Sequence, residues 1–178
     1  KVSQLNNRIS PILDKDIGYF LANKDLNLKA TVSKEEAYLN ADYVIVATPT
    51  NYDVETNYFN TKSVETVIKD VIRINSKAVI VIKSTVPVGT ARNVKHLILE
   101  NNKDADFDIA SNPEFLREGD AIADFMKPDR VVVGVENERS QNVLKELYHP
   151  LDLIKIPILF TTLESAELIK YASNAFLA

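Results

Sequence analysis

The sequence lacks cysteine entirely and contains little glycine. Among its 178 residues there is no cysteine, so the chain has no disulfide framework, no thiolate zinc site and no thiol nucleophile of its own. Glycine occurs only at positions 18, 89, 119 and 134. These positions form no G-x-G-x-x-G turn, the motif that seats a pyrophosphate on a helix N-terminus. If the chain binds a dinucleotide, we expect that turn, and with it the first βαβ unit, to be missing from it.

Long apolar runs and clustered basic residues are also absent. The longest apolar runs, such as residues 79–82, are far too short to span a bilayer. The formal net charge is -4, and without a long basic run neither duplex nucleic acid nor an anionic membrane surface is an expected partner. No spacing of metal-ligating residue types predicts a metal site. These features favour a cytoplasmic protein.

The residues that are present predict an α/β fold. Hydrophobic residues make up 46% of the chain and charged residues 26%, a composition that allows one ordinary core and argues against disorder. Short β-branched runs alternate with helical periodicity, which is typical of a Rossmann-like, doubly wound parallel sheet. The expected strands are residues 28–32, 43–47, 79–83, 106–110, 130–135 and 156–160. The second and third are continuously apolar, so we expect them to be central strands.

Helices are expected between these strands. Ser33 and Glu36 have the spacing of a capping box, in which a hydroxyl and a carboxylate each bind a backbone N–H group. Apolar residues at positions 64, 67, 68, 71 and 72 form one helical stripe, which predicts a helix packed on the core. A last helix is expected to follow residues 161–164 and to run to the end of the chain.

Two loops place polar side chains next to Pro and Gly directly after expected strands. One spans residues 112–119 and contains Glu114, Arg117 and Glu118, and the other contains Thr85. Because ligands bind open α/β sheets beyond the carboxyl ends of the strands, we expect both loops to form one site. An ordinary helix start would account for Thr85 equally well, and an acidic helix start that complements the helix dipole is the alternative for the two glutamates.

The last expected helix contributes further candidates. Glu167, Lys170 and Asn174 follow one another at i, i+3 and i+7, so they share one face. A solvated stripe would explain a single lysine there, whereas Lys170 and Asn174 together can donate hydrogen bonds to a developing oxyanion. Residues 48–53, which include Thr50, are locally more typical of a turn than of a site.

These motifs together resemble the UDP-glucose/GDP-mannose dehydrogenase family. The matching segments occur in the family's order and cover nearly the whole chain. They are residues 10–12 (SPI), 41–52 (ADYVIVATPTNY), 57–61 (NYFNT), 64–65 (VE), 82–89 (IKSTVPVG), 112–119 (NPEFLREG), 128–134 (PDRVVVG) and 166–178 (AELIKYASNAFLA). The resemblance implies an NAD-dependent enzyme that oxidises the C6 alcohol of UDP-glucose to the carboxylate of UDP-glucuronate in two successive steps.

The resemblance also implies a role for each candidate residue. Thr85 would hold the catalytic water near the nicotinamide, and Glu114 would be the base for that water. Lys170 would stabilise the alkoxide, and Asn174 would donate to the oxyanion. The implied NAD contacts are Lys1, Thr50, Thr85 and Glu118, and the implied substrate contacts are Glu114, Phe115, Leu116, Arg117, Glu118, Lys170 and Asn174.

The chain departs from the family pattern by omission. The family forms its covalent intermediates on a cysteine, assisted by an aspartate, in the domain that follows the central helix. We therefore expect an N-terminal fragment that is inactive by itself. Residues 1–160 would form an incomplete NAD-binding domain, and residues 161–178 would begin the central helix about which the full-length protein forms a homodimer.

Other functions remain open at this point. A sister enzyme acting on UDP-N-acetylmannosamine or GDP-mannose would share the same two-step chemistry. A non-catalytic nucleotide-sugar-binding protein could keep the sheet and lose the chemistry. A two-domain hydroxyacid dehydrogenase would share the sheet and a helical Lys-x-x-x-Asn, although the loop around Glu114 makes it a poorer match.

Overall fold

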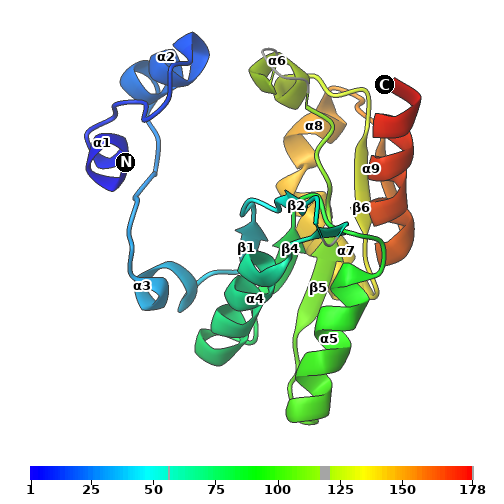
Figure 1. The fold of residues 1–178 in the computed structure, drawn as a ribbon. Helices are drawn as coiled ribbons and strands as arrows, with labels where there is room; N and C mark the ends of the chain where they lie inside the picture. Colours follow the sequence, from blue (N-terminus) through cyan, green and yellow to red (C-terminus); the bar gives the residue numbers. More distant parts are fainter. Residues whose placement is uncertain (56, 117–120, 178) are drawn as a thin grey trace.

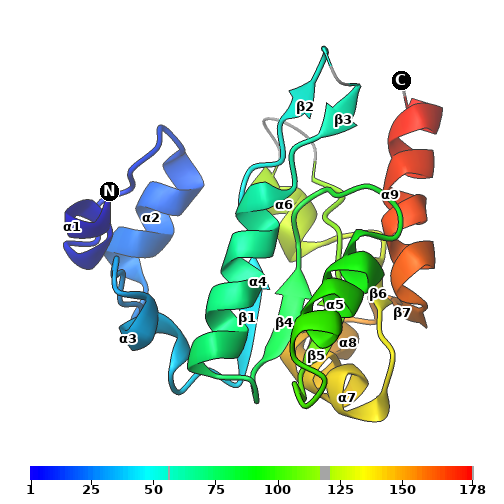
Figure 2. The same ribbon diagram turned by 60° about the horizontal axis from the view of Figure 1, so that its bottom comes forward.

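The computed structural model describes residues 1–55, 57–116 and 121–177. Figure 1 shows a sheet with helices on both faces, and α1 and α2 stand apart from that sheet in both Figure 1 and Figure 2. The helices are α1 Val2–Asn6, α2 Lys15–Asn23, α3 Lys34–Tyr38, α4 Lys62–Ile74, α5 Thr90–Asn101, α6 Ala121–Met126, α7 Glu138–Leu147, α8 His149–Leu153 and α9 Leu163–Leu177. The strands are β1 Tyr43–Val46, β2 Tyr52–Asp53, β3 Tyr58–Phe59, β4 Val79–Ile82, β5 Asp108–Ser111, β6 Val131–Gly134 and β7 Ile158–Thr161.

The main sheet has the strand order β1-β4-β5-β6-β7. The pairs β1–β4, β4–β5 and β6–β7 are parallel, which confirms the Rossmann-like α/β fold. One strand pair departs from the predicted parallel arrangement, because β5 and β6 are antiparallel and share only the pair Ser111 and Gly134. The chain leaves β5 at its carboxyl end and forms α6 before β6. It therefore begins β6 from that end of the sheet and runs back.

Helices pack on both faces of β4. Ile80 and Ile82 belong to a core cluster shared with α4 and α5, whereas Val79 and Val81 belong to a second cluster shared with α7. All four side chains are completely buried. The alternation of side chains along a strand thus sends two residues to each layer, as a doubly wound sheet requires.

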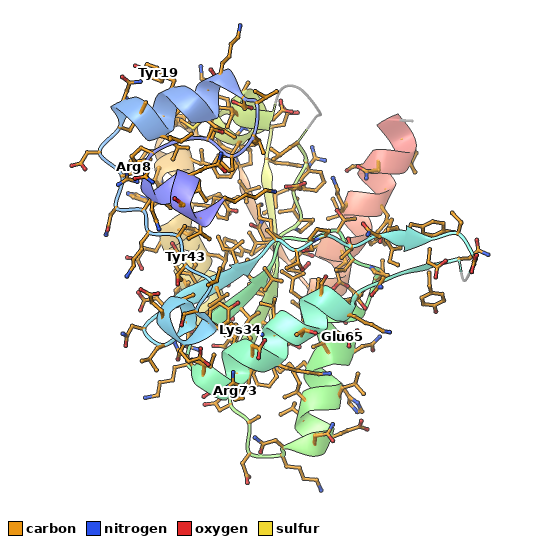
Figure 3. The ribbon with its side chains drawn as sticks, turned by 60° about the vertical axis from the view of Figure 1, so that its left-hand side comes forward. Arg8, Tyr19, Lys34, Tyr43, Glu65 and Arg73 are labelled. Carbon is orange, nitrogen blue, oxygen red and sulfur yellow. The ribbon has the colours of Figure 1, made fainter. Side chains whose placement is uncertain are left out.

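The expected central position of residues 43–47 was wrong for the described part of the chain. Strand β1 lies at the edge of the sheet, with β4 on one side only. Val44 and Val46 are buried against α4, but Tyr43 and Ile45 are 38% and 43% exposed. Figure 3 shows Tyr43 at this edge. A continuous apolar run does not distinguish a central strand from an edge strand, because neighbours in the sheet are not encoded in the run itself.

No strand forms at residues 28–32. The backbone of Ala30 bonds instead to the side chain of Asn6, which donates to Ala30 O at 3.0 Å and accepts from Ala30 N at 2.7 Å. Arg8 donates to Leu28 O at 3.5 Å. A β-prone sequence becomes a strand only where another strand supplies ladder hydrogen bonds, and no described strand lies beside this segment.

The capping box at the start of α3 is only half formed. Ser33 Oγ accepts from Glu36 N at 3.2 Å, as predicted. The Glu36 carboxylate, however, accepts from Thr31 Oγ1 at 2.6 Å and pairs with Lys29 instead of returning to Ser33. Beyond α3, Lys34 pairs with Asp70 of α4 at 2.6 Å, and Figure 3 shows the α3 and α4 side chains of this contact region together.

Helix α9 docks closely on the sheet and on α5. A Cβ atom at Gly134 would lie 2.6 Å from Thr162 O and 2.9 Å from the Cβ of Ala166, so only glycine allows this approach. The buried carboxylate of Glu167 accepts from the backbone N–H groups of Gly89 and Ala91, at 2.5 and 3.0 Å. These contacts fix the direction of α9 and therefore the position of the side chains that follow on it. No helix in the described ranges is both long and apolar enough to cross a membrane.

Candidate active site

Two pockets open beside the carboxyl ends of β1, β4 and β5. The smaller, of about 260 Å³, is lined by residues 47–50 after β1, by Lys83, Ser84 and Thr85 after β4, and by Glu114 after β5. The larger, of about 480 Å³, includes Lys83, Glu114 and Phe115 in its lining. Because Lys83 and Glu114 line both pockets, the two loops expected to form one site do meet there.

The loop after β1 and the loop after β4 are joined by hydrogen bonds, among them that of Ser84 Oγ to Thr48 O at 2.6 Å. Thr50 Oγ1 donates to the backbone O of Thr85 at 2.5 Å. The two threonines expected near the cofactor are therefore neighbours on the wall of the smaller pocket. The segment that begins at the end of the expected turn at residues 48–53 contains the short antiparallel pair β2–β3, which Figure 2 shows rising above the sheet.

The loop that carries Glu114 starts from a buried and fully bonded Asn112. Its Nδ2 donates to Val132 O at 2.8 Å, its backbone N donates to Ile82 O at 2.8 Å, and its Oδ1 accepts from Lys83 Nζ at 3.2 Å. The hydroxyl of Tyr148 also donates to Oδ1. Burial raises the pKa of Tyr148 to about 12, so its proton stays in place at neutral pH. This network holds the loop against the end of β4.

Two cationic side chains lie close to the ring of Phe115. Lys170 Nζ lies 5.5 Å from the centre of the Phe115 ring, and the Arg130 guanidinium carbon lies 5.1 Å from it. Both distances are within the range of cation–π attraction. Arg130 also donates to Ser173 Oγ at 3.3 Å, which links the start of β6 to α9. The aromatic ring thus connects the loop after β5 with the helix that carries Lys170.

Burial disfavours the charged form of both lysines of the site. Burial lowers the pKa of Lys170, and the nearby carboxylate of Glu114 opposes that shift. Burial also lowers the pKa of Lys83, the Glu114 carboxylate again opposes the shift, and the Lys170 ammonium adds to it. Glu114 and the two lysines therefore form one electrostatically coupled group, and a positively charged group of this kind suits an oxyanion.

Not every predicted site residue joins this group. Asn174 lies one turn beyond Lys170 on α9 but is exposed. Leu116 lines the larger pocket. Lys1 precedes α1, in the segment that stands apart from the sheet, so the structure does not bring it to either pocket. Arg117 and Glu118 lie outside the described residues.

Sequence reasoning missed three residues of the site. Lys83, Arg130 and Tyr148 all line the larger pocket. A signal for Lys83 exists, because it follows four fully buried strand residues directly and therefore begins at the edge of the core. Arg130 and Tyr148 have no comparable local signal, because their roles depend on the rings and amides that tertiary packing places beside them.

The family model and the curated relatives that match this chain indicate the same protein family. The model that matches residues 1–152 describes the NAD binding domain of the UDP-glucose/GDP-mannose dehydrogenase family. UDP-glucose 6-dehydrogenases of Campylobacter jejuni subsp. jejuni and Streptococcus pneumoniae are 38% and 41% identical to this chain over 178 and 185 residues. The matches cover 100% of this chain but 44% and 45% of those relatives. The chain thus spans less than half the length of the curated relatives it matches.

Two solved structures share the fold closely. A UDP-glucose dehydrogenase from the archaeon Pyrobaculum islandicum superposes with a TM-score of 0.87 at 36% identity, covering 99% of this chain and 41% of the other. A GDP-mannose dehydrogenase from Pseudomonas aeruginosa, solved as a ternary complex, has a TM-score of 0.87 at 31% identity and covers 99% and 42%. The sheet and the docked α9 are therefore part of a shared architecture.

Proposed function

The chain belongs to the UDP-glucose/GDP-mannose dehydrogenase family, and from this premise we propose that the protein carrying it oxidises UDP-glucose to UDP-glucuronate with NAD. The observation that carries the proposal is the shared lining of the two pockets. Glu114 lines both of them, with Thr85 in one and Phe115, which Lys170 overlies, in the other. A base, a hydroxyl and a cation thus converge where ligands bind sheets of this kind.

The proposed chemistry consists of two balanced oxidations. In the first, the C6 alcohol loses a proton and a hydride and becomes an aldehyde. In the second, the aldehyde carbon gains the oxygen of one water and loses a second hydride, and two protons are released, giving a carboxylate. Lys170 donates to the oxygen as it becomes negative, with Asn174 as a second donor, and Glu114 takes the proton of the water, which Thr85 holds.

The residues after β1 and β4 fit one end of the cofactor. Bound NAD supplies the acceptor for one hydride in each step. The smaller pocket, at about 260 Å³, is lined by Thr50 and Thr85, which carry hydroxyl groups, and by the apolar Pro49. Such a pocket suits a nicotinamide ring with its ribose better than an entire dinucleotide. The proposal includes Lys1 and Glu118 as further NAD contacts on the family resemblance alone.

The substrate lies in the larger pocket in this proposal. Phe115 and Leu116 line that pocket directly. Arg117 completes the proposed contacts of the loop on the family resemblance. Because the 178 residues contain no cysteine, the thiol of the family's covalent steps has to come from a part of the protein outside them. We therefore propose that this chain does not complete the oxidation alone.

The proposal extends to the setting of the enzyme. Residues 1–160 act as part of the NAD-binding domain, and residues 161–178 belong to a central helix that forms the homodimer. Leu168 and Phe176 on α9 are 55% and 91% exposed, which supports a partner for this helix. The proposed use of NAD and nucleotide sugars supports a cytoplasmic enzyme.

A sister substrate is the second candidate. The similarity to the Pseudomonas aeruginosa GDP-mannose dehydrogenase, with the same TM-score as the archaeal UDP-glucose enzyme, favours testing GDP-mannose in particular. UDP-N-acetylmannosamine is the third substrate to compare. A nucleotide-sugar-binding protein without turnover is the alternative of another class.

Turnover of the three nucleotide sugars by the full-length protein tests the proposal. We expect UDP-glucose to have the highest kcat/KM and to yield two NADH for each sugar oxidised. Glu114→Gln should lower kcat by about 10² or more, the usual contribution of a general base. Glu100→Gln, at an exposed position on α5, is the matched control and should leave the rate unchanged. Absence of NADH with all three sugars, despite binding, would instead support the non-catalytic alternative.

A further inference from the structure

Lys83 occupies the point at which the two pockets meet. It is the first residue after β4 and lines both the smaller and the larger pocket. Its backbone N still donates to Val46 O of β1 at 2.9 Å, so the start of the side chain is fixed by the sheet. The family roles described above include no function for this side chain. In the sequence, Lys83 is recognisable only as a charged residue at the end of a buried strand.

The ammonium group is held in one direction by Asn112. Lys83 Nζ donates to Asn112 Oδ1 at 3.2 Å and to Asn112 O at 3.4 Å. The Asn112 amide cannot turn away, because Nδ2 is bonded to Val132 O and Oδ1 also accepts from Tyr148. An ammonium group has three N–H donors and these contacts use two. No other contact of Nζ is present among the described residues, so the third donor can bind a ligand in the pocket.

Lys83, Lys170 and Glu114 form a group with one more positive than negative charge. In the described part of the chain, the charged groups that influence Lys83 are the Glu114 carboxylate and the Lys170 ammonium. Lys83 and Lys170 are thus two cations, and the Glu114 carboxylate offsets the charge of only one of them. A neutral alcohol bound between them would leave this excess in place, whereas a carboxylate would balance it.

A purely structural role does not explain the choice of lysine. A neutral donor such as glutamine could bind Asn112 without the desolvation of a buried charge. No ion pair joins Lys83 to another described residue that would offset this cost. Buried charges without a protein partner are typical of sites that bind an oppositely charged ligand.

From this geometry we infer that Lys83 binds the carboxylate of an anionic nucleotide sugar, as a second cation in addition to Lys170. Lys83 is thereby a product-binding residue that distinguishes the sugar acid from the sugar alcohol. The inference rests on the proposed function, because that function supplies a substrate and a product that differ in one carboxylate. The family resemblance assigns no ligand contact to Lys83, and the inference assigns it one.

Binding of the two nucleotide sugars to variants of the full-length protein tests the inference. Kd values for UDP-glucuronate and UDP-glucose are measured by calorimetry at one salt concentration. Lys83→Gln keeps a donor for Asn112 and removes the charge. We expect it to weaken UDP-glucuronate about tenfold, the usual effect of one charge-assisted hydrogen bond, and UDP-glucose less than about twofold. Lys83→Arg keeps the charge and should preserve the preference.

Two controls separate the possible outcomes. Lys69→Met removes a charge at an exposed position of α4 and should change neither Kd. If thermal melting shows that Lys83→Gln does not fold, Lys83→Met is used in its place, because it also removes the charge. Equal weakening of both ligands, or of neither, would overturn the inference. If the unmodified protein bound neither nucleotide sugar, the proposed function itself would fail.

Discussion

The carboxylate of Glu167 in α9 accepts a hydrogen bond from the backbone N–H of Gly89, 78 residues earlier in the chain, at 2.5 Å. Gly89 adopts a φ of 90° and is the residue before α5, so Glu167 satisfies an N–H group at the start of that helix. A second bond from Ala91 N completes the contact. One carboxylate therefore joins the loop that begins near Thr85 to the helix that carries Lys170.

Replacement of Glu167 should loosen this junction. We expect Glu167→Ala to lower the free energy of unfolding by about 1–2 kcal/mol, as the loss of a helix N-cap does. Urea denaturation measures the change. Glu164→Ala, which removes a partly exposed partner of Arg92 from the same helix, should cost less than about 1 kcal/mol. An equal loss in both variants would show that the buried cap has no special role.

Replacement of Gly134 should displace α9 as a whole. Its added Cβ would lie 2.6 Å from Thr162 O and 2.8 Å from the Cα of Leu163, so backbone atoms have to move. We expect Gly134→Ala to cost about 1–3 kcal/mol, the usual range for overpacking. Gly18→Ala is the matched control, because no atom lies within 4 Å of the new methyl group and α2 gains a better helix former. Thermal melting of both variants measures the change. An unchanged melting temperature for Gly134→Ala would show that α9 accommodates the added methyl group.

Stability should fall at high pH through Tyr148. Its pKa is raised from 10.0 to about 12, chiefly by burial. The folded chain therefore keeps a proton that the unfolded chain loses, and stability is full below pH 10 and declines as the pH rises towards 12. The expected loss is about 2–3 kcal/mol. Tyr148→Phe should lack this part of the decline, which denaturation at several pH values can measure. Identical profiles for both proteins would contradict the prediction.

The charge of Lys170 is expected to lower the stability of the folded chain and to be required for the proposed activity. Burial lowers the pKa of Lys170 more than Glu114 raises it, so the charged form is less favourable in the folded chain than in water. Lys170→Met keeps a similar volume without the charge and should raise the free energy of unfolding by about 1 kcal/mol. In the proposed enzyme the same change should abolish turnover. Lys69→Met, at an exposed position, should change stability by less than about 0.5 kcal/mol. A destabilised Lys170→Met would show that its contact with Phe115 outweighs desolvation.

Local pattern was sufficient for most of the elements. Three residues of the predicted stripe, Val64, Ile68 and Val71, are completely buried on α4, and its other two are partly buried. The strands at residues 79–83 and 106–110 formed with shifts of at most two residues at either end. These predictions succeeded because periodicity of 3.6 or 2 is a property of the chain itself.

Partners could not be predicted in the same way. Residues 28–32 were predicted to form a strand, yet their backbone bonds go to Asn6 and Arg8. Glu36 completes the capping spacing, yet its carboxylate binds Thr31 and Lys29. In each case a nearby group competed for the same donor or acceptor. Sequence spacing does not rank such competitors.

By itself, the sequence determined the alternation of strands and helices, the absence of a thiol and the family to which the chain belongs. Only the tertiary structure decided that Glu167 is a buried cap and that Lys83 faces two pockets. The physical reason is that burial and electrostatic environment are properties of the assembled layers. A charged side chain acquires its role from groups that lie far away in sequence and within a few ångströms in space.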